Sequence, residues 1–257
     1  MEVHAHSHTA DPDNHRGRKK WTHYLWEFLM LFLAVFCGFL AEYQLEHKIE
    51  SDREKQYMIS MLEDLIADTS MLETTIQRAI TMEKGLDSLK KNLYDIENLA
   101  TNVLTIYRQN AVNERLIVVS FSDQTAIQLR NSGGMRLIKK IQIANAISRY
   151  WRGINRVEFT LNNFMKASDD RENLSQFIFN RKYNIRVASN SPTIFDNYYI
   201  LPDAKLMTND NNLLINYANR TSRMQDFIAR FIKVQLISQK SGAVKLIDLI
   251  KKEYHLE

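Results

Sequence analysis

"HYLWEFLMLFLAVFCGFLAEYQLEH", residues 23–47, is the longest apolar stretch of the chain. As a helix, residues 24–45 would extend about 33 Å, which matches the hydrocarbon thickness of a bilayer. Tryptophan and tyrosine side chains at both ends are typical of the membrane interface. Because residues 31–36 show no polar face, the pattern favours a transmembrane helix over a buried helix of a soluble domain. We place this helix at residues 21–46.

The stretch lacks the features of a cleaved signal peptide. Its apolar region is too long, and Phe39 stands at the −3 position before Glu42, where cleavage requires a small residue. A lipoprotein signal is also disfavoured, because the bulky Phe36 precedes Cys37. We therefore predict an uncleaved signal-anchor.

Basic residues flank this helix unequally. "RGRKK", residues 16–20, precedes it, whereas the basic residues that follow are interleaved with acidic ones over residues 46–55. The positive-inside rule therefore predicts a cytoplasmic N-terminus. In a diderm bacterium, the helix would lie in the inner (cytoplasmic) membrane as a single-pass anchor. Residues 1–20 would form a disordered cytoplasmic tail, and residues 47–257 would form a periplasmic domain.

One face of the predicted membrane helix carries a carboxylate and small residues. Spacings of 7, 4 and 3 place four residues on this face: Glu27, Ala34, Gly38 and Ala41. Ala34 and Gly38 form a small-xxx-small pair, which lets two membrane helices approach closely. Glu27 has two interpretations. It either extends to the headgroups and pairs with Lys20 or His23, or it is buried at a helix–helix contact and serves assembly or proton transfer.

The composition of the chain is typical of long helices. Only 7 glycines and 3 prolines occur in 257 residues, so few turns are available. We predict an all-α fold, in which a single N-terminal transmembrane helix is followed by a helical bundle domain with long helices. The net charge of +4 comes from 34 basic and 30 acidic residues that are interleaved. This pattern is typical of a solvated surface, and we expect no nucleic-acid partner.

Apolar residues at helical spacing continue through residues 48–108. They form the core-facing stripe of a bundle or, less favoured, a coiled coil. Gly85 interrupts the stripe, either as a kink within one helix or as the turn of a helical hairpin, and both interpretations stay open. The stripe contains Leu62, Leu65, Thr69, Leu72, Ile76, Ala79, Leu86, Leu89, Leu93, Ile96, Ala100, Val103 and Tyr107.

The second half of the chain predicts further helices and one long loop. Residues 110–122 form a connector, whose apolar cluster has the composition of a strand without an obvious partner. Ser122 caps the next helix, and the glycines of "NSGG" end it as a left-handed C-cap, since a phosphate loop would need a different motif. Helices are expected at residues 123–131, 212–240 and 243–254, and a further long helix starts near residue 135 or 142 and ends at about residue 181. Residues 184–212 are expected to form a loop that either binds a partner or packs through its aromatic residues.

In the helix at residues 212–240 we expect a buried stripe that follows helical spacing. The tripeptide "KSG", residues 240–242, is interpreted as the turn that ends this helix. The expected inward residues are Leu214, Tyr217, Met224, Phe227, Ile228, Phe231 and Val234.

The chain lacks recognisable enzyme motifs: it has no nucleophile elbow, HExxH, cysteine pair or glycine-rich phosphate loop. His255 is the only histidine after residue 47, which leaves little material for histidine chemistry in the domain. His4, His6 and His8 alternate in the tail, where a solvated segment is favoured over a metal site. We therefore expect no catalytic residue, no cofactor and no metal.

Three segments resemble one protein family. "RKKWTHYLWEFLMLFLAVFCGFLAEYQLEHKIE", "DREKQY" and "SGGMRLIKK" are similar to segments of a group of uncharacterised single-pass inner-membrane proteins of Bacteroidota. The N-terminal match covers about 40 residues and is specific, whereas the third segment is short. The resemblance implies a single-pass topology and an inner-membrane location. The family is a domain of unknown function, so no activity follows from it.

Two functions are consistent with these features. The first is an interaction or scaffold protein, or a sensor-like protein, whose partners are the lipid bilayer and either another protein or a second copy joined through the membrane helix. The alternative is a subunit of an ion- or proton-coupled membrane complex that uses Glu27.

Overall fold

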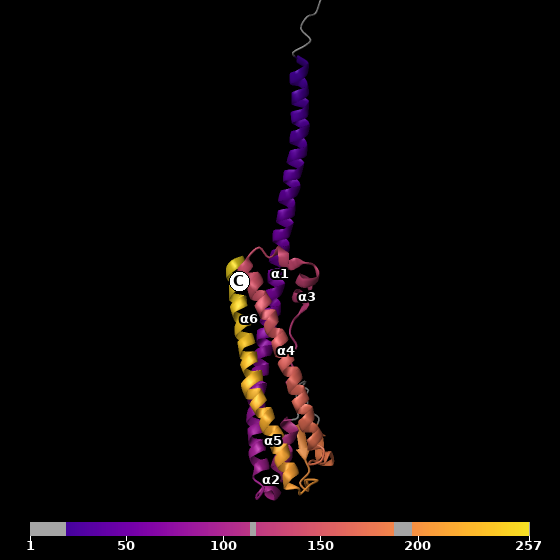
Figure 1. Ribbon diagram of the computed structural model, residues 1–257, viewed down its shortest axis with the longest axis vertical. Helices are drawn as coiled ribbons and strands as arrows, with labels where there is room; N and C mark the ends of the chain where they lie inside the picture. The colour runs from indigo at the N-terminus through magenta and orange to yellow at the C-terminus, as the bar shows by residue number, and fades with distance from the viewer. Residues whose placement is uncertain (1–18, 114–116, 188–196, 257) are drawn as a thin grey trace, which may run out of the picture. The chain divides into compact units, whose positions relative to one another are not determined.

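The structure, a computed structural model, describes residues 19–113, 117–187 and 197–256. The chain divides into two compact units, Met1–Arg53 and Glu54–Glu257. Helices dominate, as expected, and a small antiparallel hairpin is added to them (Figure 1). The elements in chain order are α1 (Lys19–Tyr94), α2 (Leu99–Asn113), α3 (Gln124–Asn131), a 3₁₀ helix (Gly134–Leu137), α4 (Ile141–Ser175), a 3₁₀ turn (Arg181–Tyr183), β1 (Asn184–Val187), β2 (Asn197–Ile200), α5 (Asn211–Phe227), a π-helical turn (Ile228–Ile232) and α6 (Lys233–Tyr254).

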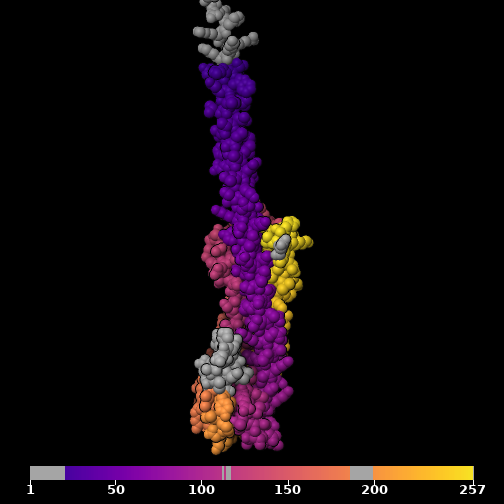
Figure 2. Space-filling model, turned by 180° about the vertical axis from the view of Figure 1, so that it is seen from behind, coloured from indigo at the N-terminus to yellow at the C-terminus, as the bar shows by residue number. Residues whose placement is uncertain are grey.

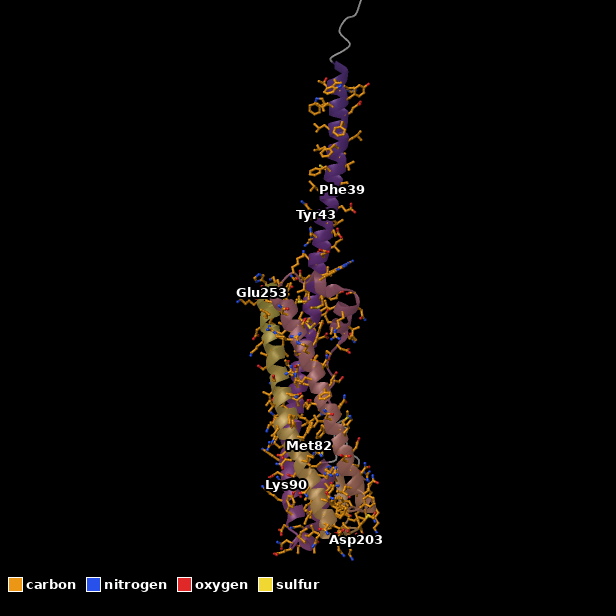
Figure 3. All side chains as sticks on the ribbon, in the orientation of Figure 1. Phe39, Tyr43, Met82, Lys90, Asp203 and Glu253 are labelled. Carbon is orange, nitrogen blue, oxygen red and sulfur yellow. The ribbon has the colours of Figure 1, made fainter. Side chains whose placement is uncertain are left out.

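The first unit contains the start of α1, which holds the apolar stretch. A window of this helix with a mean hydropathy of 2.0 is 0% buried, and the helix is long and apolar enough to cross a membrane. Phe39 and Tyr43 project away from the ribbon (Figure 3). The predicted apolar helix is thus confirmed, and its membrane role stays a prediction. Residues 1–18 of the predicted tail, with its alternating histidines, lie outside the described residues.

In the second unit, α1 continues through Gly85 to Tyr94. The glycine therefore does not form the turn between two helices, which lies at residues 95–98, before α2. A Cβ atom at Gly85 would lie only 2.6 Å from Oδ1 of Asn113. This glycine lets the end of α2 lie directly against α1. Residues 48–108 thus form a helical hairpin whose turn comes after Tyr94.

Three hydrophobic clusters follow one another along the second unit, and α1 contributes to each. In this unit α1 and α6 lie side by side (Figures 1 and 2), and α4 packs antiparallel to α6 (Figure 1). One cluster joins α1, α3, the start of α4 and the end of α6: Met58, Met61, Leu65, Leu129, Ile143, Ile147, Leu246 and Ile250. The middle cluster includes Leu72, Ile76, Ala79, Val157, Leu161, Phe164, Ile228 and Ile232. The third includes Leu89, Leu93, Ile106, Tyr107, Ile178, Leu214 and Tyr217.

Glu54, at the start of the second unit, holds two distant segments together. Its Oε1 accepts a hydrogen bond of 2.5 Å from the Tyr254 hydroxyl and one of 2.9 Å from the backbone N–H of Lys139. Nearby, Nζ of Lys140 lies 3.0 Å from the carboxylate of Glu253 (Figure 3). The carboxylate of Glu54 therefore fixes the end of α6 and the segment before α4 to α1.

The predicted turn at "KSG" is absent, and this prediction was wrong. Helix α6 runs unbroken through residues 240–242 to Tyr254. A glycine inside a helix costs about 1 kcal/mol relative to alanine, whereas each buried leucine or isoleucine side chain gains about 2 kcal/mol. Burial of Leu236, Leu246 and Ile250 against the bundle therefore maintains the helix across Gly242.

The π-helical turn between α5 and α6 changes which residues face inward. Phe231 and Val234, expected in the core, are 50% and 55% exposed, whereas Ile232 and Leu236 are buried. A π turn adds one residue to the helix, which rotates every later residue by about 100° relative to an unbroken α-helical repeat. The predicted inward positions after Ile228 were wrong for this reason.

The predicted long loop at 184–212 is partly a β-hairpin. Strands β1 and β2 pair antiparallel, with Asn184 opposite Ile200 and Val187 opposite Asn197. Ile200 is buried against the third cluster, so this segment is packed onto the bundle. Residues 188–196, which complete the predicted loop, lie outside the described residues. The all-α prediction is confirmed, with one short two-stranded sheet added to the helices.

Helix α3 begins as predicted within one residue, but its cap differs. No side chain of its N-cap residue Asp123 bonds to the helix, and Ser122 provides no cap either. Instead, carboxylates of α1 accept backbone hydrogen bonds: Asp68 from Ser122 at 2.8 Å and Asp64 from Thr125 at 3.2 Å. The helix ends at Asn131, and Gly133, two residues later, has a φ of +66°, the left-handed conformation expected at "NSGG".

Candidate functional site

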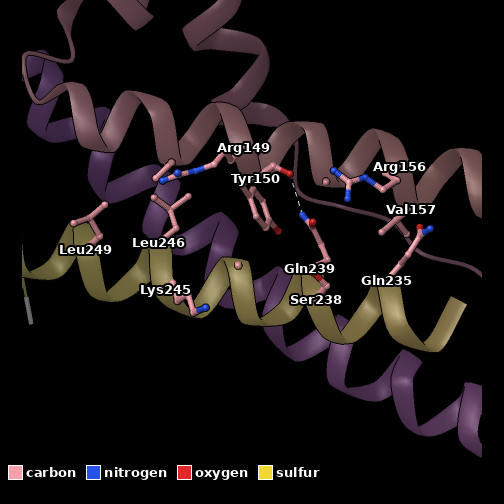
Figure 4. Close-up of a pocket in the computed structure, with 13 residues that line it drawn as sticks. Arg149, Tyr150, Arg156, Val157, Gln235, Ser238, Gln239, Lys245, Leu246 and Leu249 are labelled. Atoms are coloured by element: carbon pink, nitrogen blue, oxygen red, sulfur yellow. Dashed lines mark hydrogen bonds between the residues drawn. The ribbon is translucent and has the colours of Figure 1, made fainter. Parts of the chain in front are cut away.

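A groove of about 480 Å³ lies between the antiparallel helices α4 and α6 (Figure 4). Its walls carry three basic side chains, several polar groups and a small apolar surface, and they include no carboxylate and no histidine. The lining therefore offers cationic and neutral hydrogen-bond donors to a bound molecule. The lining residues that matter below are Arg149, Tyr150, Gly153, Arg156, Gln235, Ser238, Gln239, Gly242, Lys245 and Leu249.

Two glycines determine the shape of this groove. A Cβ atom at Gly153 of α4 would lie 1.9 Å from Oε1 of Gln239, so glycine at this position leaves room for the Gln239 side chain. Gln239 is buried, and its amide nitrogen donates to the carbonyl of Tyr150 at 3.1 Å (Figure 4). Opposite, Gly242 has no atom within 4 Å of its missing Cβ and borders open space. One glycine thus allows contact, and the other leaves room.

The basic residues of the groove differ from other cations of the bundle. Lys233 and Lys240 of α6 form ion pairs with Glu83 and Glu73 of α1, the first at 2.7 Å. By contrast, none of the three cations in the groove forms an ion pair or a hydrogen bond with any residue in the described ranges. Three like charges beside a concave surface without counter-charge produce a positive potential there.

Behind the groove, Tyr150 connects α4 to a buried carboxylate of α1. Its hydroxyl donates to Oδ2 of Asp68 at 2.7 Å. Burial raises the pKa of Asp68 above its ordinary value, although hydrogen bonds from Ser122 and Tyr150 act in the opposite direction. Burial and the contact with Asp68 likewise raise the pKa of Tyr150. The hydrogen bond between Tyr150 and Asp68 thus connects a residue that lines the groove to a residue in the interior of the bundle.

Another basic residue of α4, Arg171, is enclosed in the bundle, where it is 1% exposed. Its guanidinium donates to the side-chain oxygen of Asn110 at 3.1 Å, to the Tyr217 hydroxyl at 2.7 Å and to the carbonyl of Asn113 at 2.9 Å. It also lies over the Tyr217 ring, 5.6 Å from the ring centroid. These contacts join α2, α4 and α5, so Arg171 has a structural role.

The residues predicted for membrane-helix packing all lie on the exposed part of α1: Glu27, Ala34, Gly38 and Ala41. No atom lies within 4 Å of the missing Cβ of Gly38. Glu27 lies 3.1 Å from Nε2 of His23, one of the two partners that its first interpretation named. The packing role of this face stays a prediction.

Sequence reasoning did not find the groove, because its residues are distant in the chain and resemble an ordinary solvated helix surface. One signal was present. Gly153 and Gly242 interrupt helical patterns in a chain with only 7 glycines, and an interior glycine in a helix indicates a close contact or a local requirement for space. "KSG" was interpreted as a turn, so this signal was missed at Gly242. In the described ranges, no group of three metal-ligating side chains occurs.

Comparison of the chain with protein-family models, with curated proteins and with solved structures finds no match.

Proposed function

We propose that the chain is a single-pass membrane-anchored protein whose helical bundle serves as an interaction, scaffold or sensor-like module. The observation that supports this most is α1 itself. Its first part, residues 21–49, is apolar and exposed, whereas its later part supplies core residues to all three clusters of the second unit. An exposed apolar segment of this length needs a lipid environment, because exposed in water it would promote aggregation.

The proposed orientation has a cytoplasmic N-terminus and a periplasmic bundle, in agreement with the basic residues at 16–20 and with the family resemblance. Extraction of membranes with alkaline carbonate tests the anchor: the full chain should stay in the pellet, and a variant lacking residues 21–46 should be released. Release of the full chain would contradict the anchor.

Cysteine labelling tests the orientation. In a Cys37→Ser background, a membrane-impermeant maleimide applied to intact spheroplasts should label a Ser241→Cys variant and spare a Thr9→Cys variant. Ser241 is exposed on α6. The reverse pattern would contradict a periplasmic bundle, and both cysteines should react once the membrane is permeabilised.

The partner is proposed to contact the face of Ala34 and Gly38. An Ala34→Cys variant in the Cys37→Ser background should form a disulfide-linked dimer on oxidation in native membranes if the partner is a second copy. Phe36→Cys, on the opposite face, is the matched control and should not crosslink. Equal crosslinking from both positions would indicate random collision and would contradict a specific face.

The alternative, a subunit of an ion- or proton-coupled complex, depends on Glu27. The contact with His23 gives this carboxylate a partner within its own chain, which favours the simple anchor. A proton-transfer role predicts that Glu27→Gln abolishes function while membrane insertion and crosslinking through Ala34 persist. A fully active Glu27→Gln protein would exclude this role.

A further inference from the structure

We propose that the α4–α6 groove binds a small, elongated organic molecule with an anionic group at each end. This inference goes beyond the membrane-anchor proposal and does not depend on it. The volume of about 480 Å³ falls within the range of small-molecule pockets, roughly 300–1,000 Å³. No carboxylate lines the groove, and its three cations form no ion pair with any described residue, so the groove favours negative charge.

The positions of the cations indicate two separate anionic groups. Arg149 and Arg156 lie on one face of α4, seven residues and therefore about 10 Å apart along the helix axis. Lys245 of α6 lies toward the Arg149 end of the groove (Figure 4). One end thus offers a guanidinium and an ammonium, and the other offers a guanidinium. A guanidinium is well suited to bidentate binding of a carboxylate or phosphate.

Neutral donors complete the end of the groove near Arg156. Oε1 of Gln235 accepts from the hydroxyl of Thr160 at 2.8 Å, which leaves the amide nitrogen of this glutamine as a donor. Ser238, one turn further along α6, adds a hydroxyl to the same wall. A second anionic group at this end would therefore receive hydrogen bonds from one charged and two neutral side chains.

The middle of the groove suits an uncharged linker. Gly242 of α6 borders open space here, whereas the space beside Gly153 of α4 is taken by the side chain of Gln239, so the open part of the wall lies on the α6 side. The wall also includes Val157, Leu246 and Leu249, whose apolar surface can contact methylene groups. A nucleic acid would need a continuous row of basic residues along an extended surface, whereas here the charge is confined to the two ends of a short groove.

Binding of linear dicarboxylates to the full chain in neutral detergent tests this proposal. Titration calorimetry and thermal unfolding would be measured with succinate, adipate and suberate, with hexanoate as the single-charge control. We expect the longer dicarboxylates to bind at least about tenfold more tightly than hexanoate and to weaken as salt is raised. No binding of any dicarboxylate below about 10 mM would overturn the proposal.

Two further probes separate possible sources of the anionic groups. Inorganic phosphate tests for a site that takes any simple anion, and phosphatidylglycerol vesicles test for a lipid headgroup. Phosphate binding as tight as suberate, with the same dependence on the arginines, would overturn the requirement for two linked anionic groups. If the protein bound phosphatidylglycerol vesicles but none of the dicarboxylates, the proposal of a small soluble ligand would be overturned.

Variants of the groove give the decisive comparison. Arg149→Gln and Arg156→Gln should each weaken suberate binding about tenfold, the loss expected for one charge-assisted hydrogen bond, whereas Arg152→Gln should not. Arg152 is exposed on α4 and does not line the groove. A loss in Arg152→Gln equal to that in Arg149→Gln would show non-specific attraction and overturn the site.

A change of shape provides an independent test. Gly242→Leu should fill the open space and abolish binding while the protein stays folded, because nothing lies within 4 Å of the position of its Cβ. Ser241→Leu is the matched control: it places the same side chain on the exposed surface beside the groove and should bind normally. Normal binding by Gly242→Leu would overturn this location of the ligand.

Discussion

Helix α4 carries arginines in two opposite environments. Arg171 is buried and makes three hydrogen bonds to residues of α2 and α5. Arg149 and Arg156 are exposed in a groove and make no ion pair with any residue of the described segments. A charge that the fold has enclosed contributes to stability, whereas a charge without a partner beside a cavity is available for a ligand. What its guanidinium contacts therefore separates the structural role of Arg171 from the binding role proposed for Arg149 and Arg156.

The largest effect is expected from Arg171→Met. The substitution removes three hydrogen bonds from a buried site and should lower the free energy of unfolding by about 3 kcal/mol. Arg171→Lys should also destabilise, since an ammonium cannot reproduce the planar fork of donors. Denaturant unfolding of the full chain in detergent measures both. If Arg171→Met changed the free energy of unfolding by less than about 0.5 kcal/mol, buried Arg171 would not differ in its contribution to stability from the exposed arginines of the groove.

The glycines of the groove should respond in opposite directions. Gly153→Ala should destabilise by about 2 kcal/mol, because its Cβ would lie 1.9 Å from Oε1 of Gln239. Gly242→Ala, where the space is empty, should stabilise by about 0.7 kcal/mol through helix propensity. Thermal unfolding compares the two. The addition of Gln239→Ala should reduce the cost of Gly153→Ala, and a cost unchanged by it would place the strain elsewhere.

A paired carboxylate of α1, Asp87, should make a contribution to stability that depends on pH. Hydrogen bonds from Lys91 and Lys90 lower the pKa of Asp87 to about 2. A lowered pKa means that the stabilisation is present at neutral pH and is lost as pH falls through that value. After solvent screening, Asp87→Asn should cost about 1 kcal/mol near pH 7, and the difference from the unmodified protein should shrink toward pH 2. Denaturant midpoints across this range measure it, and a constant difference would contradict the ion pairs.

The smallest effect on stability is expected in the groove. Arg149→Gln and Arg156→Gln remove charges without partners, so the free energy of unfolding should change by less than about 0.5 kcal/mol. Their double variant should be neutral or slightly more stable, because like charges are removed. The same unfolding experiment as for Arg171 measures this, and a loss of about 2 kcal/mol would show that these arginines hold the fold together.

The helices were predictable from local periodicity, whereas the groove was not. The stripe from Leu62 to Ala79 is buried almost as expected, although Asp68 rather than Thr69 faces the interior. Periodicity failed where one extra residue enters the helix, as at Ile228–Ile232, because a π turn leaves no signal in composition. The groove depends on the pairing of α4 with α6, and residues 149 and 245 become neighbours only through that tertiary contact.

The contact between Tyr254 and Glu54 spans 200 positions of the chain. Helix α6 is therefore made long after α1, and the part of the α1 stripe that packs against α6 stays uncovered until then, although α2, α3 and α4 are made earlier. At about 5–20 residues per second, the 200 positions between Glu54 and Tyr254 correspond to roughly 10 to 40 s of synthesis. During that interval the residues of α1 that pack against α6 have no α6 partner, and this side of the bundle closes only once α6 has been made. Loss of the last turn of α6 should consequently impair biogenesis more than the small number of contacts it makes would indicate.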